Sequence, residues 1–193
     1  MRYWNAEEGF WTRGFSVTNK VIPLKDLIDK RSEKTVVEFL SSFSCSKDKD
    51  VQRYLRETAV KHEINHISRT YLIFDSEQNE QLVAFITIAM KCLIIGKENH
   101  EEKLIGMMNV SNGTAQSYLI GQLGKTDDYE KKVGDFAISF ATNIILQANQ
   151  LVGCRTIRLD CKDALVGYYE KNGFSLLSRN NENGLNRMVR ILT

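Results

Sequence analysis

The chain has 193 residues, of which 42% are hydrophobic and 26% charged, a balance typical of an ordinary globular domain. The formal net charge of +2 excludes the strongly basic composition common in nucleic-acid-binding proteins, although it allows a local basic patch. The length suits one domain over residues 1–193, and no repeat or low-complexity segment divides it.

Three further features bear on where the protein works. Residues 1–15 lack the apolar run of a signal peptide, and the longest apolar stretch, 82–96, is too short to span a bilayer. The four cysteines include no CxxC pair, so we expect reduced thiols and no structural zinc. The sequence therefore predicts a cytoplasmic protein without a membrane segment.

The first half of the chain changes from helical to strand patterns. A helix is predicted within residues 24–43, and a second over 50–68, with Asp50 as its N-cap. The β-branched and aromatic run 70–74 predicts a strand, and 82–95 predicts a longer one. Because only a short polar turn separates these two strands, we expect an antiparallel hairpin.

The second half begins with a polar stretch in which 101–108 is predicted to form a short helix. Residues 118–124 follow as a strand. The segment 131–150 then carries an apolar stripe at i, i+3, i+4 and i+7, which predicts a long amphipathic helix.

The C-terminal part predicts a strand at 156–161 and a short helix at 164–171. Asp163 is the expected cap of that helix, and Gly173 the left-handed residue that ends it. The last two strands are predicted at 174–177 and 186–192. This order of elements indicates an α/β (α+β) domain, in which helices cover a mixed sheet.

The junction between strand 118–124 and the long helix is the first candidate site. Helix N-termini bind phosphate through free N–H groups, and Lys131 and Lys132 add positive charge there. Gly134 permits close backbone approach, and Gly124 removes a side chain where a ligand could press on the strand. The predicted cofactor-binding residues are Gln122, Leu123, Gly124, Lys125, Glu130, Lys131, Lys132, Val133, Gly134 and Asp135.

The second candidate site is the short helix that contains Tyr168 and Tyr169. Neighbouring residues on a helix diverge by about 100°, so one tyrosine can pack in the core while the other faces a cleft. Packing is the expected role of Tyr168.

The segment from Tyr168 to Phe174, YYEKNGF, resembles the (F/L)YEKxGF signature of the GNAT acetyltransferases. The strand, loop and long helix before it resemble the region that carries the CoA pyrophosphate loop of that superfamily, (Q/R)xxGx(G/A). By layout the resemblance covers about residues 70–193. It implies a GNAT-like, mostly antiparallel sheet, splayed at its centre at strand 118–124 and flanked by helices.

The resemblance also implies an activity, the transfer of an acetyl group from acetyl-CoA to a primary amine without a metal. Backbone N–H groups of the splayed strand would hold the pantetheine arm and polarise the thioester carbonyl. Tyr169 matches the family tyrosine that protonates the departing thiolate, and is the predicted catalytic residue. No general base is identified.

Shorter similarities resemble the TacT-like toxin branch, which acetylates aminoacyl-tRNA and blocks translation. They are Phe43-Ser44-Cys45, residues 51–55, residues 68–72 and the strand segment 120–124. Membership of this branch would imply tRNA and an antitoxin as candidate partners and a homodimer as a candidate assembly. No association with a membrane is expected. The candidate tRNA contacts are Arg53, Arg56, Lys61 and Arg69, for which a solvated helix face is the alternative.

The loop departs from the family pattern. Aligned on Gly134, the first loop glycine is Lys132 and the Gln/Arg position is Tyr129. Two further functions therefore stay open beside the toxin-like one. The chain could acetylate a small amine or a protein amine, or it could be a non-catalytic CoA-binding or interaction module.

Overall fold

The computed structural model describes residues 3–5, 10–12, 19–77, 81–95, 102–179 and 184–192. Within these residues, one seven-stranded sheet has the order β3-β4-β5-β6-β7-β9-β8. Among its neighbouring pairs, β6 and β7 run parallel and the others antiparallel. The strands are β3 (Asn19–Pro23), β4 (Arg69–Asp75), β5 (Gln81–Ile94), β6 (Thr114–Lys125), β7 (Thr156–Cys161), β8 (Ser175–Ser178) and β9 (Asn186–Ile191). The predicted mixed, mostly antiparallel sheet is therefore confirmed.

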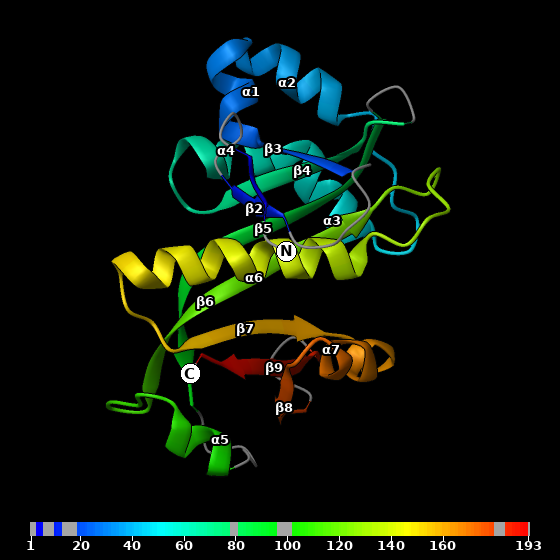
Figure 1. Cartoon of the computed structure of the whole chain (residues 1–193). Coiled ribbons are helices and arrows are strands. Elements are labelled where there is room, and N and C mark those ends of the chain that lie inside the picture. The colour runs from blue at the N-terminus through cyan, green and yellow to red at the C-terminus, as the bar shows by residue number, and fades with distance from the viewer. Residues whose placement is uncertain are drawn as a thin grey trace.

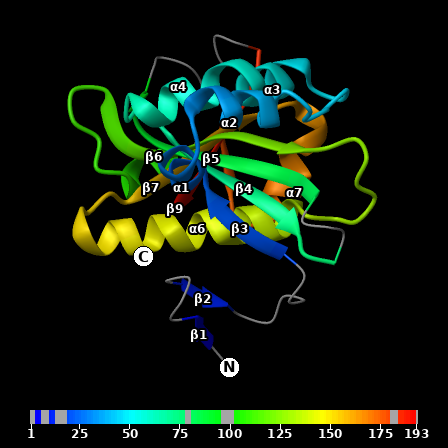
Figure 2. The ribbon, with the colours of Figure 1, turned by 90° about the horizontal axis from the view of Figure 1, so that it is seen from above.

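Helices cover both faces of this sheet (Figures 1 and 2). The long helix α6 (Gly134–Leu151) lies across one face, and the short helix α7 (Val166–Lys171) packs into the same core cluster as α6. The opposite face carries the N-terminal helices, α1 to α4. The first two, α1 (Leu24–Lys30) and α2 (Glu33–Leu40), fall in the region predicted to be helical, which is divided where the Ser32 hydroxyl accepts the N–H of Thr35.

The predicted helix over 50–68 is three consecutive segments. They are α3 (Lys49–Arg53), a π-helical turn η1 (Tyr54–Thr58) and α4 (Ala59–Ile64). The predicted cap was wrong by two residues, because the carboxylate of Asp48 accepts the N–H groups of Asp50 and Val51. Asp50 therefore lies in the first turn, where its charge suits the helix dipole.

The predicted hairpin is confirmed, since β4 and β5 pair antiparallel from Arg69↔Ile88 to Asp75↔Gln81. Strand β3 was not predicted. It pairs with β4 from Asn19↔Asp75 to Pro23↔Tyr71, and a segment of five residues that contains Lys20 and Pro23 has no clear strand pattern. A separate two-stranded sheet joins β1 (Tyr3–Asn5) and β2 (Phe10–Thr12).

The second half follows the predicted order with two corrections. Helix α5 (Glu102–Met107) lies in the polar stretch, but α6 begins at Gly134, so Lys131 and Lys132 belong to the preceding loop. Asp163 does not cap a helix. It begins a 3-10 turn, η2 (Asp163–Leu165), and its carboxylate accepts from Asn186 at 2.7 Å. Gly173 has φ +82°, the left-handed value expected where α7 ends.

Each face of the sheet has its own core. Alternate residues of the strands pack against α6 on one side, and Leu72, Phe74 and Phe85 pack against α1–α4 on the other. A smaller cluster joins Leu93 and Val189 to α5. In the described ranges, no helix is long and apolar enough to cross a membrane.

Candidate functional site

The centre of the sheet opens between β6 and β7. Their parallel pairing is limited to Tyr118↔Ile157 and Leu119↔Arg158, although both strands, described in full, continue beyond these pairs. We call the Leu119–Arg158 pair the vertex. Figure 1 shows the two strands parting toward the end where α6 begins and α7 lies. The splay predicted at strand 118–124 is therefore present. Beyond the vertex, the edges of β6 and β7 that face each other are not paired with each other.

A bulge in the β5–β6 pairing lies next to the vertex. The register shifts between Ile86 and Ile88, and the hydroxyl of the intervening Thr87 accepts the N–H of Gln122 at 2.7 Å. The bulge turns the strand locally, so the β6 backbone beyond it follows a course different from that of β7.

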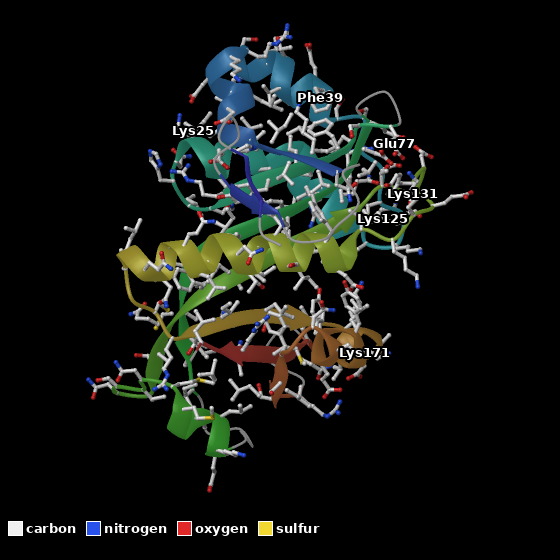
Figure 3. All side chains as sticks on the ribbon, in the orientation of Figure 1. Lys25, Phe39, Glu77, Lys125, Lys131 and Lys171 are labelled. Carbon is white, nitrogen blue, oxygen red and sulfur yellow. The ribbon has the colours of Figure 1, made fainter. Side chains whose placement is uncertain are left out.

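The loop from β6 to α6 is held by an enclosed carboxylate. Asp75, at the end of β4, accepts the hydroxyl of Tyr129 at 2.9 Å and the ammonium of Lys131 at 3.1 Å on the same oxygen. Lys131 also lies 3.4 Å from Glu77, and Lys125 donates to the carbonyl of Tyr129. Figure 3 shows Glu77, Lys125 and Lys131 together beyond the beginning of α6. This network fixes the loop to the sheet.

The same network determines the ionisation of its members. Burial alone would raise the pKa of Asp75, but the Glu77 N–H, Lys131 and Tyr129 stabilise the carboxylate and hold its pKa below the usual value. The bond to Asp75 in turn raises the pKa of Lys131. The charge of Lys131 is thus paired with that of Asp75 within the protein. Lys132 is exposed and has no partner among the described residues, so it is the freer cation of the two.

Tyr168 approaches the first residue of α6. A Cβ atom on Gly134 would lie 2.5 Å from the Tyr168 hydroxyl, so glycine there makes room for the phenol. This hydroxyl is enclosed and makes no hydrogen bond of ordinary geometry. Burial, followed by the neighbouring carboxylate of Asp135, raises the pKa of Tyr168. Tyr168 therefore has the packing role that was expected.

Tyr169, one residue further along α7, is turned toward the sheet. Its ring packs edge-on against Tyr168 at 5.2 Å and Phe174 at 6.1 Å between centroids. The side chain is buried, but unlike that of Tyr168 its hydroxyl is not enclosed, and no described residue accepts its proton. Burial raises the pKa of Tyr169 to about 12, so the phenol keeps its proton at neutral pH. A protonated phenol without an acceptor in the chain is able to donate a hydrogen bond or a proton to a ligand.

The residues predicted to bind the cofactor lie in different environments. Leu123 and Val133 pack against the core beneath α6, and a Cβ on Gly124 would meet Phe85 and Val51 on the opposite face at 2.5 and 2.6 Å. The absence of a side chain at Gly124 is thus explained by packing. The residues at or near the beginning of α6 are Glu130, Lys132, Gly134 and Asp135.

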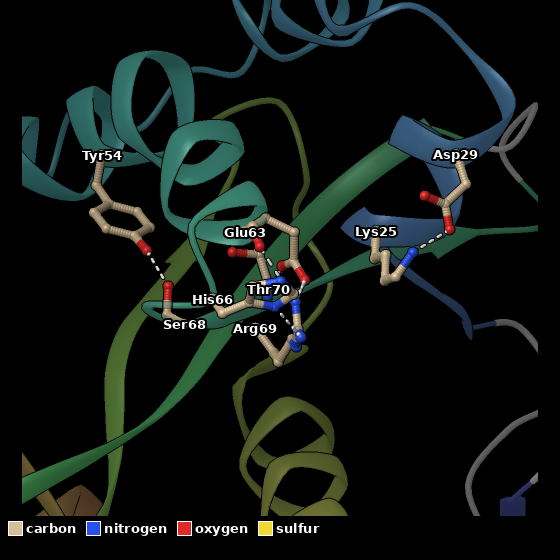
Figure 4. A network of polar contacts seen from close by, with 8 residues as sticks. All are labelled: Lys25, Asp29, Tyr54, Glu63, His66, Ser68, Arg69 and Thr70. Atoms are coloured by element: carbon tan, nitrogen blue, oxygen red, sulfur yellow. Dashed lines mark hydrogen bonds and ion pairs between the residues drawn. The ribbon is translucent and has the colours of Figure 1, made fainter.

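The predicted tRNA contacts have intramolecular partners in three of four cases. Arg53 pairs with Asp50, and Arg56 donates to the carbonyl of Phe43 at 2.7 Å. Arg69 donates to Glu63 and contacts His66, in the network of Figure 4. Lys61 is exposed. Arg56 and Arg69 therefore tie α3–α4 to neighbouring segments, whereas Arg53 and Lys61 remain on the exposed surface.

Sequence reasoning missed the Asp75–Tyr129 pair. The pair joins residues 54 positions apart, and a single acid at the end of a strand gives no signal in the sequence. A separate hollow of about 650 Å³ lies at the other end of β7, lined by Met108, Asn149 and Thr156 among others. No group of acidic, histidine or cysteine residues in the described ranges could hold a metal ion.

Comparisons with known proteins bear on the fold. No family model and no curated protein matches the sequence. A solved structure of KacT, with a tyrosine changed to phenylalanine, has TM-score 0.68 and 15% identity, covering 90% of this chain and 95% of that one. AtaT complexed with acetyl-methionyl-tRNAfMet has TM-score 0.65 and 19% identity, covering 87% and 93%. AtaTR bound with AcCoA has TM-score 0.64 and 18% identity, covering 90% and 93%. The GNAT-like fold is thereby confirmed.

Proposed function

We propose that the chain transfers the acetyl group of acetyl-CoA to the amino group of aminoacyl-tRNA. The observation that carries this proposal is the opening between β6 and β7, at the end where α6 begins and where α7, which contains Tyr169, lies (Figure 1). The similarity to AtaT, solved with AcCoA and with acetyl-methionyl-tRNAfMet, supports the choice of donor and acceptor.

The donor supplies an acyl thioester, which the neutral amine of the acceptor attacks. Charge then develops on the carbonyl oxygen, and N–H groups of β6 beyond the vertex are free to stabilise it, at about 3–4 kcal/mol for each well-placed donor. When the C–S bond breaks, the thiolate accepts the proton of Tyr169. The amine loses its own proton to solvent, because no base is identified among the described residues.

The beginning of α6 fits the diphosphate of the donor. Its first-turn N–H groups lack helical partners and carry the positive end of the helix dipole. Lys132 adds the cation that Lys131 cannot, since Lys131 is bound to Asp75. Gln122, Lys125, Glu130 and Asp135 stay predicted contacts of the donor, whereas Leu123, Gly124 and Val133 are accounted for by packing.

The purified chain, acetyl-CoA and a set of aminoacyl-tRNAs test this function, with acetylated product detected by mass spectrometry. Tyr169→Phe is expected to lower the rate by about 10²–10⁴-fold, since it removes the general acid, while calorimetry shows unchanged CoA binding. Wild-type turnover in that variant would contradict the role of Tyr169.

Other outcomes would identify the alternative functions. Thiol release with small amines or protein amines, but not with aminoacyl-tRNA, would indicate a different acceptor. CoA binding without turnover on any amine would indicate a binding module. Each of these results would overturn the proposed substrate.

We also propose a single cytoplasmic domain over residues 1–193, neutralised by an antitoxin. AtaT has been solved with the C-terminus of its antitoxin AtaR, and KacTA with DNA. Expression of the chain is expected to arrest growth, and the Tyr169→Phe variant to relieve the arrest. The homodimer stays a prediction that sedimentation can test.

A further inference from the structure

An arginine stands at the vertex of the sheet. Arg158 is the last residue of β7 that pairs with β6, opposite Leu119, and only 6% of its surface is exposed. Its neighbours Ile157 and Leu159 pack beneath α6, whereas Arg158 pairs with Val189, which belongs to the α5 cluster. The alternation of a strand therefore places the guanidinium on the face opposite α6.

This guanidinium lacks the partners that a buried cation needs. Its Nε is enclosed and has no acceptor, and no described residue accepts from its two terminal nitrogens. Those terminal nitrogens are not enclosed. An arginine carries five N–H donors in a fixed fork, and here the enclosed Nε–H is unsatisfied, which is costly, while the terminal N–H groups are open to an acceptor from outside the chain. The open end of the fork therefore points to an acceptor that the chain does not itself supply.

A second arginine increases the excess of positive charge. Arg187 on β9 donates to Asp160 at 3.3 Å and to the carbonyl of Ile94 at 3.4 Å, both long bonds, and its side chain is 16% exposed. Burial lowers the pKa of Arg158, with Asp160 raising it and Arg187 lowering it further. Among the residues that the structure describes, the two guanidiniums thus share the one carboxylate of Asp160, which leaves one positive charge in excess beside the vertex.

We propose that Arg158, with Arg187, binds a phosphodiester near the 3′ end of the RNA that carries the acceptor amine. This inference rests on the proposed function for its choice of ligand. The carboxyl group of an aminoacyl ester is uncharged, so a phosphodiester is the anion nearest to the amine. One phosphodiester carries one negative charge, which matches the excess, and the arginine fork suits its two free oxygens.

The position of Arg158 and Arg187 lets the acceptor and the donor approach the opening from opposite faces of the sheet. The donor is assigned to the face of α6 and α7, and Arg158 lies at the vertex on the opposite face. A phosphate held there places the end of the RNA against the opening from the side that the donor does not use. The net charge of the chain need not be high for RNA to bind here, because these two arginines form a local cationic site.

The test compares two acceptors that differ in one charge. Both are aminoacyl dinucleotides, cytidylyl-adenosine with a stable 3′-amide-linked amino acid, one with a phosphodiester and one with a neutral methylphosphonate linkage. For the wild-type chain, the phosphodiester acceptor is expected to have a kcat/KM about tenfold to a hundredfold higher. Arg158→Met is expected to remove this ratio, and Arg158→Lys to restore part of it.

Arg155→Met is the matched control, because Arg155 is exposed just before the same strand and its loss changes net charge equally. It should keep the wild-type ratio. A merely structural arginine would lower kcat/KM for both acceptors alike and lower the melting temperature. Arg158→Met is instead expected to keep or raise the melting temperature, since replacing a buried unpaired charge by an apolar chain relieves its cost.

Binding of the unacylated dinucleotides, measured by calorimetry, separates this inference from the proposed function. If no acceptor is acetylated, but the phosphodiester binds more tightly than the methylphosphonate and Arg158→Met removes the difference, the anion site stands and the function fails. If both acceptors are acetylated equally well, the anion site is overturned and the function stands. Acetylation of a free amino acid with the same Arg158 dependence would also overturn it, in favour of a carboxylate.

Discussion

Tyr168 and Tyr169 are adjacent in the chain, yet their hydroxyl groups have opposite surroundings. The hydroxyl of Tyr168 is enclosed against Gly134 and makes no hydrogen bond of ordinary geometry, whereas that of Tyr169 is not enclosed. An enclosed hydroxyl without a partner costs free energy, about 1–3 kcal/mol. The first phenol therefore packs against the beginning of α6, and the second keeps a hydroxyl that suits the proton donation proposed for it.

Tyr168→Phe is accordingly expected to keep the acetylation rate and to leave the melting temperature unchanged or higher, because it removes an unsatisfied polar atom. Scanning calorimetry and the thiol-release assay measure both quantities. The matched variant is Tyr169→Phe, in which the acetylation rate should fall. A loss of activity in Tyr168→Phe with a normal rate in Tyr169→Phe would exchange the two roles.

Gly124 shows the same principle in the core. A Cβ there would lie 2.5 Å from the ring of Phe85 and 2.6 Å from Val51. Gly124→Ala is expected to destabilise the chain by about 1–3 kcal/mol through overpacking. In a protein of this size that lowers the melting temperature by about 2–4 °C per kcal/mol.

Gly153→Ala provides the control for this prediction, since a Cβ at Gly153 meets nothing within 4 Å. The melting temperature of that variant should stay level or rise slightly, because alanine restricts the unfolded chain. Equal melting temperatures for the two variants would show that Gly124 is not tightly packed.

At the scale of the elements, the loop before α6 depends on the end of β4. Asp75→Asn removes the charge that holds Lys131 and Tyr129, so we expect a lower melting temperature and weaker CoA binding at pH 7. Because the folded pKa of Asp75 is lowered, its contribution is present above the unfolded value of about 3.9 and is lost as the pH falls through the folded pKa.

The melting temperatures of wild type and Asp75→Asn should therefore differ at neutral pH and converge below about pH 4. Asp29→Asn is the control, because Asp29 forms an exposed pair with Lys25 within one helix, and such pairs contribute little. A constant difference across this pH range would indicate that Asp75 acts through packing and not through its charge.

Elements defined by local pattern could be predicted from the sequence. The hairpin of β4 and β5 and the stripe of α6 depend on residues close in the chain, and the YYEKNGF segment located α7. The unpredicted features depend on distant contacts. Tyr129 bonds to Asp75, 54 residues away, and Arg158 is buried because its strand pairs with β6 at Leu119 and with β9 at Val189. Such contacts between distant residues cannot be predicted from the spacing of residues along the sequence.

At the scale of the whole molecule, the opening and the separate hollow offer two different binding places. Acetyl-CoA is expected to slow amide hydrogen exchange in the parts of β6 and β7 beyond the vertex, 120–125 and 159–161, and at the beginning of α6. Strand β4, already paired on both sides, should change little. Slower exchange around Met108 and Thr156 in its place would put the donor in the hollow.

The two-pair contact between β6 and β7 gives this sheet an internal edge. Proteins protect the edges of sheets against pairing with foreign chains by charge, bulges or coverage. Here the edge lies inside a wedge, where an extended ligand bearing amide groups could act as a surrogate strand. Ligand binding then stabilises the fold by mass action, so the chain should be recovered from cells with its carrier already bound, and be least soluble when stripped of it.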